Sequence, residues 1–189
     1  MTLQERIGHR DRIKLRVEDY ATLDQSGAFA PYIATELIDG MVYAMSPQYR
    51  PHGFVKDELA YRLRRALEAN DSSLHVATEQ SIEIAPYNEP QPDIIVTSQP
   101  RGTGAIPASS ITLLVEVSVT TLEFDTVDKA ALYAATAIPE YWVVDVDGRV
   151  VHQMWGPVGE RYAEQRTVGF GERIAAETIV GLAIDTESL

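Results

Sequence analysis

Residues 111 to 118 read ITLLVEVS, an apolar run interrupted by a single glutamate. Apolar residues fill both alternating positions of the run, as in a central strand that is covered on both faces. A second dense run, PDIIVT, occupies residues 92 to 97. The two runs predict the middle of a β-sheet, and the loop from Ser98 to Ser110, rich in Gly, Pro and Ser, joins them.

The chain before these strands predicts helices and a hairpin. Residues 17 to 24 predict a short helix. TELIDGMVYAM, residues 35 to 45, predicts a β-hairpin, because Asp39-Gly40 is a pair favoured in tight turns. Apolar residues then recur at helical spacing from His52 to Asn70, which predicts a long amphipathic helix.

The remaining segments complete an α/β fold. Residues 75 to 85 predict one strand with Gln80 on its apolar face. Residues 125 to 138 predict a helix that ends before Pro139, and residues 140 to 146 a further buried strand. Strand-like segments from residue 149 to 184 form a C-terminal β meander. The prediction is a mixed central β-sheet flanked by helices, with an N-terminal β-hairpin and the meander.

Composition limits the class of protein. With 189 residues, of which 45% are hydrophobic and 23% charged, the chain predicts one globular domain over residues 1–189. The absence of Cys excludes disulfides, thiolate zinc sites and a cysteine nucleophile. No apolar run approaches the ~18 residues of a membrane span. We therefore expect a cytoplasmic protein without a membrane partner.

Two carboxylates lie in the apolar runs, where an unpaired charge is costly. Asp93 lies five residues before the predicted loop, and Glu116 six residues after it. If the loop joins antiparallel strands, the two side chains face each other on one side of the sheet. Opposed carboxylates require a compensating cation, and their oxygens suit Mg or Mn.

The following helix supplies a positive charge. Lys129 lies one turn after Asp125 and one turn before Tyr133, so the three share a face. Carboxylates, a lysine and a tyrosine donor together indicate phosphodiester hydrolysis. From spacing alone, a solvent-facing Lys129 paired with Asp125 is an equal alternative, and Tyr133 is expected to be a packing residue.

An ordered series of motifs resembles the Uma-type restriction endonuclease family of the PD-(D/E)XK nuclease superfamily. The resemblance implies a restriction-endonuclease-like core, catalytic and metal-binding roles for Asp93 and Glu116, a divalent Mg or Mn cofactor, and endonuclease cleavage of DNA. The motifs are ELIDGMVYAMSP at 36–47, PD at 92–93, LLVEVS at 113–118, DxxxKxxxY at 125–133 and PEYWVVD at 139–145.

The chain departs from the superfamily pattern at one position. The superfamily's ExK element places a lysine two residues after the glutamate, where this chain has Ser118. The Uma-type pattern instead places a lysine on the next helix, which assigns the catalytic role to Lys129. Glu36 and His52 also match family positions, and they are candidates for an outer metal ligand or a phosphate contact.

Several alternatives stay open at this point. Ser118 suggests a catalytically silent member that binds nucleic acid or protein. A third possibility is a structural dimer that uses a surface bearing Trp142, and a homodimer is expected in any case. By position alone, His52 is better explained as an exposed residue of the first helical turn than as a site residue. Gln80 could equally hydrogen-bond to a site group or to the backbone.

Charge is distributed unevenly. Sixteen Lys and Arg against 28 Asp and Glu give a net charge of -12. Residues 1 to 16 nevertheless hold five basic and two acidic groups, and residues 48 to 66 again hold five and two. We therefore expect DNA to approach the basic N-terminal arm, residues 1–16, and the long helix, and to bind weakly and with metal.

Overall fold

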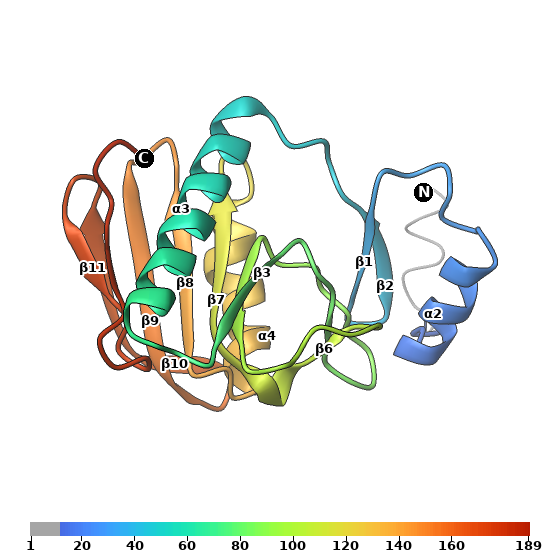
Figure 1. The fold of residues 1–189 in the computed structure, drawn as a ribbon. Helices are drawn as coiled ribbons and strands as arrows, with labels where there is room; N and C mark the ends of the chain where they lie inside the picture. The colour runs from blue at the N-terminus through green and yellow to red at the C-terminus, as the bar shows by residue number, and fades with distance from the viewer. Residues whose placement is uncertain (1–11) are drawn as a thin grey trace.

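A six-stranded mixed sheet forms the centre of the computed structural model, which describes residues 12–189 (Figure 1). The part of the basic arm before Arg12 lies outside the described residues. The strand order is β10-β9-β8-β7-β5-β3, in which only β7 and β8 are parallel neighbours. The strands are β3 (His75–Thr78), β5 (Ile94–Thr97), β7 (Ile111–Ser118), β8 (Glu140–Asp145), β9 (Val150–Val158) and β10 (Arg161–Gly169).

Helices cover both faces of this sheet. The long helix α3 (Arg50–Ala69) packs its buried face against one side (Figure 1). The short helix α4 (Ala130–Ala135) packs against the other side and belongs to the crossover between the parallel strands β7 and β8. A π-helical turn, η2 (Phe124–Lys129), leads into α4. The predicted mixed sheet flanked by helices is therefore confirmed.

Alternation along β7 determines which core each side chain enters. Leu113, Val115 and Val117 join the core beneath α3, whereas Leu114 joins the core beneath α4. Because successive side chains point to opposite faces of a strand, Glu116 points toward α4. The strand pattern thus places the one charged residue of ITLLVEVS on the same side of the sheet as Lys129.

Smaller elements form two-stranded sheets of their own, separate from the central sheet. The hairpin β1 (Thr35–Ile38) and β2 (Met41–Ala44) turns at Asp39 and Gly40, whose φ angles of 49° and 74° are those of a tight hairpin turn. This confirms the predicted N-terminal hairpin, and α2 (Val17–Gln25) confirms the short helix. The minor pairs are β4 (Ile82–Glu83) with β6 (Ile106–Pro107) and β11 (Arg173–Ala175) with β12 (Ala183–Asp185), and η1 (Ala108–Ser110) is a single 3-10 turn.

One strand prediction is wrong. Residues 75 to 85 do not form a single strand, because the chain breaks after β3 at Glu79, whose φ of 53° is incompatible with a strand. Gln80 is consequently exposed instead of lying on an apolar face. The β4 segment then pairs with β6, away from β3.

Two further expectations are corrected. The helix predicted over residues 125 to 138 begins as the π-helical turn η2 and already ends at Ala135. Trp142 is fully buried in β8, where its indole N–H donates to Glu140 Oε1 at 2.6 Å. A dimer that uses a Trp142-bearing surface is therefore wrong. Within residues 12–189, no helix combines the length and apolar character that a bilayer crossing requires.

Candidate active site

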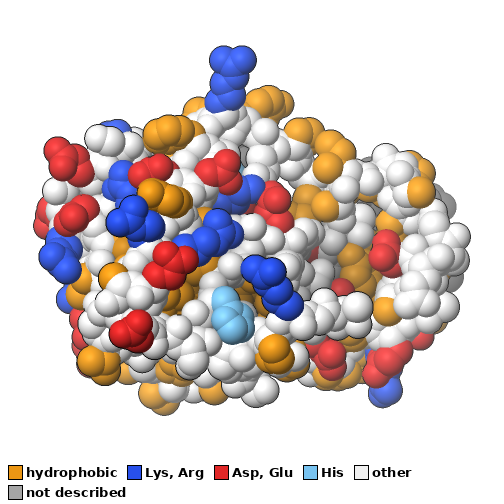
Figure 2. All heavy atoms as spheres, viewed as in Figure 1, with side chains coloured by type: hydrophobic (Ala, Val, Ile, Leu, Met, Phe, Trp, Pro, Cys, Tyr) orange, Lys and Arg blue, Asp and Glu red, His pale blue; other side chains and the backbone are white. Residues whose placement is uncertain are grey.

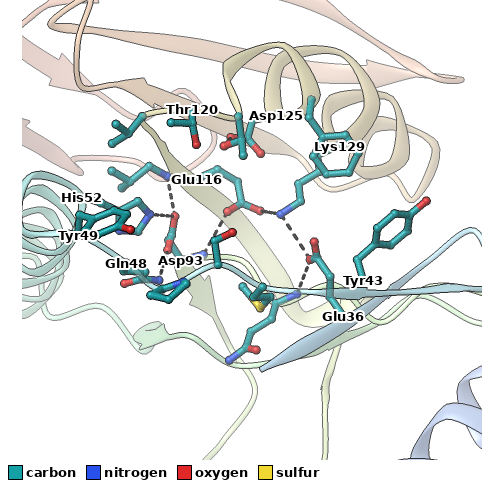
Figure 3. A pocket seen from close by; sticks show the side chains of 18 of the residues that line it. Glu36, Tyr43, Gln48, Tyr49, His52, Asp93, Glu116, Thr120, Asp125 and Lys129 are labelled. Atoms are coloured by element: carbon teal, nitrogen blue, oxygen red, sulfur yellow. Dashed lines mark hydrogen bonds and ion pairs between the residues drawn. The ribbon is translucent and has the colours of Figure 1, made fainter. Parts of the chain in front are cut away.

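A pocket of about 620 Å³ lies where the loop after β2 and the start of α3 meet the ends of β5 and β7 (Figure 3). The turn η2 closes its far side. Four acidic side chains and one lysine line it, each less than one tenth exposed. These buried charged residues are Glu36, Asp93, Glu116, Asp125 and Lys129.

The predicted opposition of Asp93 and Glu116 is present. The antiparallel strands β5 and β7 pair Ile94 with Val115, so the preceding Asp93 stands opposite Glu116. The backbone N–H of Asp93 lies 3.4 Å from Glu116 Oε2, and the N–H of Val117 donates to Asp93 Oδ2 at 2.8 Å. Strand pairing thus holds both carboxylates at one end of the sheet.

Lys129 and Tyr133 bind one oxygen of Glu116. Lys129 Nζ donates to Glu116 Oε1 at 3.0 Å, and the Tyr133 hydroxyl donates to the same oxygen at 2.9 Å. Lys129 Nζ also lies 3.5 Å from Glu36 Oε2. Lys129 is therefore buried between two carboxylates, and the alternative of a solvent-facing lysine is wrong.

Asp125 and Lys129 both belong to the π-helical turn, and both line the pocket. A π turn contains about one more residue than an α turn, and such turns frequently occur at functional sites. Thr121 Oγ1 donates to Asp125 Oδ2 at 2.6 Å, and the Tyr141 hydroxyl donates to the Asp125 carbonyl at 3.0 Å. These two hydrogen bonds hold Asp125 near the start of the turn, and Lys129 lies at its end.

Asp93 contacts His52, a residue that the sequence indicates, and Gln48, a residue that it does not. His52 Nε2 lies 3.2 Å from Asp93 Oδ2, and the amide of Gln48 donates to Asp93 Oδ1 at 3.3 Å. Lys56 Nζ in turn donates to Gln48 Oε1 at 2.6 Å and to Glu79 at 2.5 Å. Lys56 could have been found, because it lies one turn after His52 on the same helix face. Gln48 could not have been found in this way, because it lies in a loop, where the sequence shows no helical or strand periodicity.

Each central carboxylate keeps one oxygen with spare accepting capacity. Among residues 12–189, Asp93 Oδ1 and Glu116 Oε2 accept only the long contacts of 3.3 and 3.4 Å described above. In contrast, the fully buried Glu140 accepts five hydrogen bonds of 2.6 to 2.9 Å and has a purely structural environment. The two pocket oxygens, each with one long contact, therefore keep lone pairs that could bind a cation or a ligand.

Burial and charge shift the titration of the central pair. Burial raises the pKa of Glu116 to about 8; Lys129 opposes this rise, whereas the Asp93 and Asp125 carboxylates add to it. Burial would lower the pKa of Lys129, but Glu116, Glu36 and Asp125 outweigh it and hold this pKa above its ordinary value. Lys129 therefore stays positively charged. Its charge does not fully offset the cost of burying ionised Glu116 beside two other carboxylates.

The donor set fits a hard divalent cation. Within residues 12–189, no three His, Asp or Glu side chains converge as a complete protein-made metal site. Asp93 and Glu116 nevertheless face each other with one available oxygen each. Mg²⁺ is commonly bound through one or two carboxylates together with water and substrate phosphate oxygens. These two residues could therefore hold such a cation.

The structure brings most of the residues singled out in the sequence to this pocket. Glu36 contacts Lys129, His52 contacts Asp93, and Tyr133 contacts Glu116. His52 is only partly buried, and its Nδ1 has no partner among the described residues. Gln80 does not reach the pocket, because the break at Glu79 turns it outward.

The match to a family profile indicates a nuclease of the restriction-endonuclease-like type. The chain belongs to the Uma2 family, described as "Putative restriction endonuclease", whose profile matches residues 17–187. Comparison with curated protein sequences gave no match.

A solved structure shares the fold. It is described as "a putative nuclease belonging to DUF820 from Anabaena variabilis ATCC 29413". The two structures superpose with a TM-score of 0.64 at 16% sequence identity, over 86% of this chain and 89% of that chain. At this identity the likeness concerns the fold alone.

Proposed function

We propose that the protein is a metal-dependent endonuclease that hydrolyses DNA phosphodiester bonds. The observation that carries this proposal is the opposition of Asp93 and Glu116 across β5 and β7, with one available oxygen on each and Lys129 on the far side of Glu116. The Uma2 family membership, described as restriction endonuclease, agrees with this chemistry.

Asp93 and Glu116 would hold the divalent cation, Mg or Mn. When bound, the cation supplies Lewis-acid charge for the attack of water on the phosphodiester. Val117 N–H and His52 fix Oδ2 of Asp93, which leaves Oδ1 toward the pocket. Lys129 and Tyr133 fix Oε1 of Glu116, which leaves Oε2 toward Asp93.

Lys129 contributes the fixed positive charge of the site. Its raised pKa keeps the ammonium group protonated throughout the neutral range. A preorganised cation stabilises negative charge that develops on a phosphate in the transition state, and it does so best where water is excluded. In this role Lys129 substitutes for the lysine that the ExK element would place at Ser118.

The competing function is a catalytically silent member that binds nucleic acid or protein. The observation in its favour is Ser118, a buried serine at the position of the ExK lysine. The contact of 3.0 Å between Lys129 and Glu116 supports hydrolysis over this alternative, because it supplies the missing cation from the helix.

The decisive experiment is cleavage of supercoiled plasmid DNA with Mg or Mn, with and without EDTA. Wild type should nick the plasmid only with metal, and Asp93→Asn and Glu116→Gln should lose this activity. Glu123→Gln is the matched control, because Glu123 is exposed beside η2 and does not line the pocket. Equal nicking by wild type and Asp93→Asn would refute the proposal.

Metal titration by calorimetry separates the silent binder from the nuclease. A nuclease of the proposed type should bind Mg or Mn with an affinity that Glu116→Gln removes and Glu123→Gln preserves. A protein that binds DNA without any Glu116-dependent metal affinity would be the silent member instead.

A further inference from the structure

Three aromatic side chains from separate elements line the pocket. Tyr43 comes from β2, Tyr49 from the residue before α3, and Phe124 from the start of η2. Tyr43 is 50% exposed and Tyr49 is 78% exposed. The two tyrosines lie on opposite sides of the Asp93 and Glu116 carboxylates (Figure 3). Their rings are therefore available to a ligand that passes over the carboxylates.

The electrostatics of the pocket do not favour a ligand held by many phosphate contacts. Its buried lining holds four carboxylates and a single lysine. On α3, Lys56 is engaged by Glu79 and Arg62 by Glu58. Basic and acidic side chains alternate over the face of the molecule that carries α3 (Figure 2). Binding of duplex DNA depends largely on neutralising phosphates with Lys and Arg. Arg50, Arg64 and Arg65 of α3 are exposed and have no carboxylate partner among residues 12–189, but none of them lines the pocket.

Because the carboxylates are buried in the pocket, they favour a nucleic acid with a flexible sugar-phosphate backbone. Asp93 is 6% exposed and Glu116 is 4% exposed, so a phosphate must enter the pocket to reach them. Duplex DNA is stiff over about 150 base pairs, and it holds its phosphates on the surface of a rigid helix. A single strand can bend locally and insert one phosphate. A pocket of about 620 Å³ also matches a nucleotide-sized ligand.

We propose that the preferred substrate is single-stranded DNA, whose bases stack on Tyr43 and Tyr49 while the phosphate between them reaches Asp93 and Glu116. This inference rests on the proposed nuclease function. Stacking on aromatic side chains binds unpaired bases with little sequence preference, because every base presents a π face. Tyr43 and Tyr49 are thus specificity-determining residues, since a duplex cannot offer them its paired bases.

Binding is tested with fluorescent oligothymidine, alone and annealed to oligodeoxyadenosine, in Ca²⁺ to suppress cleavage. Fluorescence anisotropy should give a dissociation constant about tenfold lower for the single strand. Tyr49→Ala and Tyr43→Ala should each weaken single-strand binding by about tenfold, and Tyr49→Trp should preserve it. Tyr32→Ala is the matched control, because Tyr32 is 55% exposed and does not line the pocket.

The outcomes distinguish the two proposals. Cleavage in Mg or Mn is measured on the same two DNAs. If neither is cleaved, the proposed nuclease function fails. If both are cleaved but the duplex is preferred, only the single-strand inference fails. Unchanged single-strand binding by both tyrosine variants would likewise overturn the stacking role while leaving the nuclease function intact.

Discussion

Lys129 donates a 3.0 Å hydrogen bond to Glu116 Oε1, although Lys129 comes from a helical turn and Glu116 from the central sheet. Tyr133, one turn further along, donates to the same oxygen at 2.9 Å. Because Oε1 is occupied by these two donors, Oε2 is directed toward Asp93. The position of the helix therefore fixes the orientation of the carboxylate at the bottom of the pocket.

Replacing Lys129 by Met removes the positive charge and keeps a side chain of similar shape. We expect metal-dependent cleavage to fall by about 100-fold or more, because a preorganised charge is lost at the reacting phosphate. The plasmid nicking assay measures this fall, and thermal unfolding followed by circular dichroism checks that the variant folds. Arg64→Met, at an exposed position of α3, should cleave like wild type.

A lysine at position 118 provides a rescue test in the same background. Ser118 and Glu116 are two residues apart on β7, so their side chains point to the same face. The double variant Lys129→Met, Ser118→Lys should therefore recover part of the lost cleavage. A double variant that folds but stays as inactive as Lys129→Met would show that the two positions are not equivalent.

Stability of the metal-free protein should fall as pH rises through the neutral range. Burial raises the pKa of Glu116 from its ordinary 4.5 to about 8 in the native state. Between these values the native state binds more protons than the unfolded chain, so the free energy of unfolding decreases with increasing pH. Urea unfolding from pH 5 to pH 8 measures this slope. Glu116→Gln should flatten it, and an equally steep slope in that variant would assign it to other groups.

Glu140 should behave as a purely structural carboxylate. It is completely buried and accepts hydrogen bonds from Trp142, Gln153 and the backbone at Glu177 and Thr178. Glu140→Gln replaces an acceptor by a donor, and we expect the free energy of unfolding to fall by about 3 kcal/mol in urea.

The metal dependence of cleavage should be unchanged in Glu140→Gln. The exposed Glu164 on β10 offers the control, since Glu164→Gln should leave stability as it is. A Glu140→Gln protein as stable as wild type would argue against the structural role.

The opposition of Asp93 and Glu116 could be predicted, because counting residues from the loop gives the pairing of two antiparallel strands. Two apolar runs and the loop between them determine that Asp93 faces Glu116, and the structure places them so. Helical spacing likewise predicted that Lys129 and Tyr133 share a face. The single domain over residues 1–189, the homodimer and the choice between Mg and Mn stay predictions.

The missed features depend on local backbone conformation and on tertiary packing. The positive φ of Glu79 interrupts a regular alternation of apolar and polar residues. Glutamate is not a residue type that favours positive φ, so the sequence does not indicate the break and predicts the wrong face for Gln80. The burial of Lys56 depends on Gln48 and Glu79, which come from segments before and after its own helix. Tyr49 carries no periodic signal, because it precedes the first turn of α3.

The π-helical turn Phe124–Lys129 imposes a constraint on the length of the chain. Each residue of an α-helix advances the helix by about 100°. Deleting one residue within the turn would therefore leave either Asp125 or Lys129 out of phase with the pocket. The exposed side chains of Val127 and Asp128 are free to vary in identity. Homologues and engineered variants should thus tolerate substitutions of Val127 and Asp128, but neither insertions nor deletions within the turn.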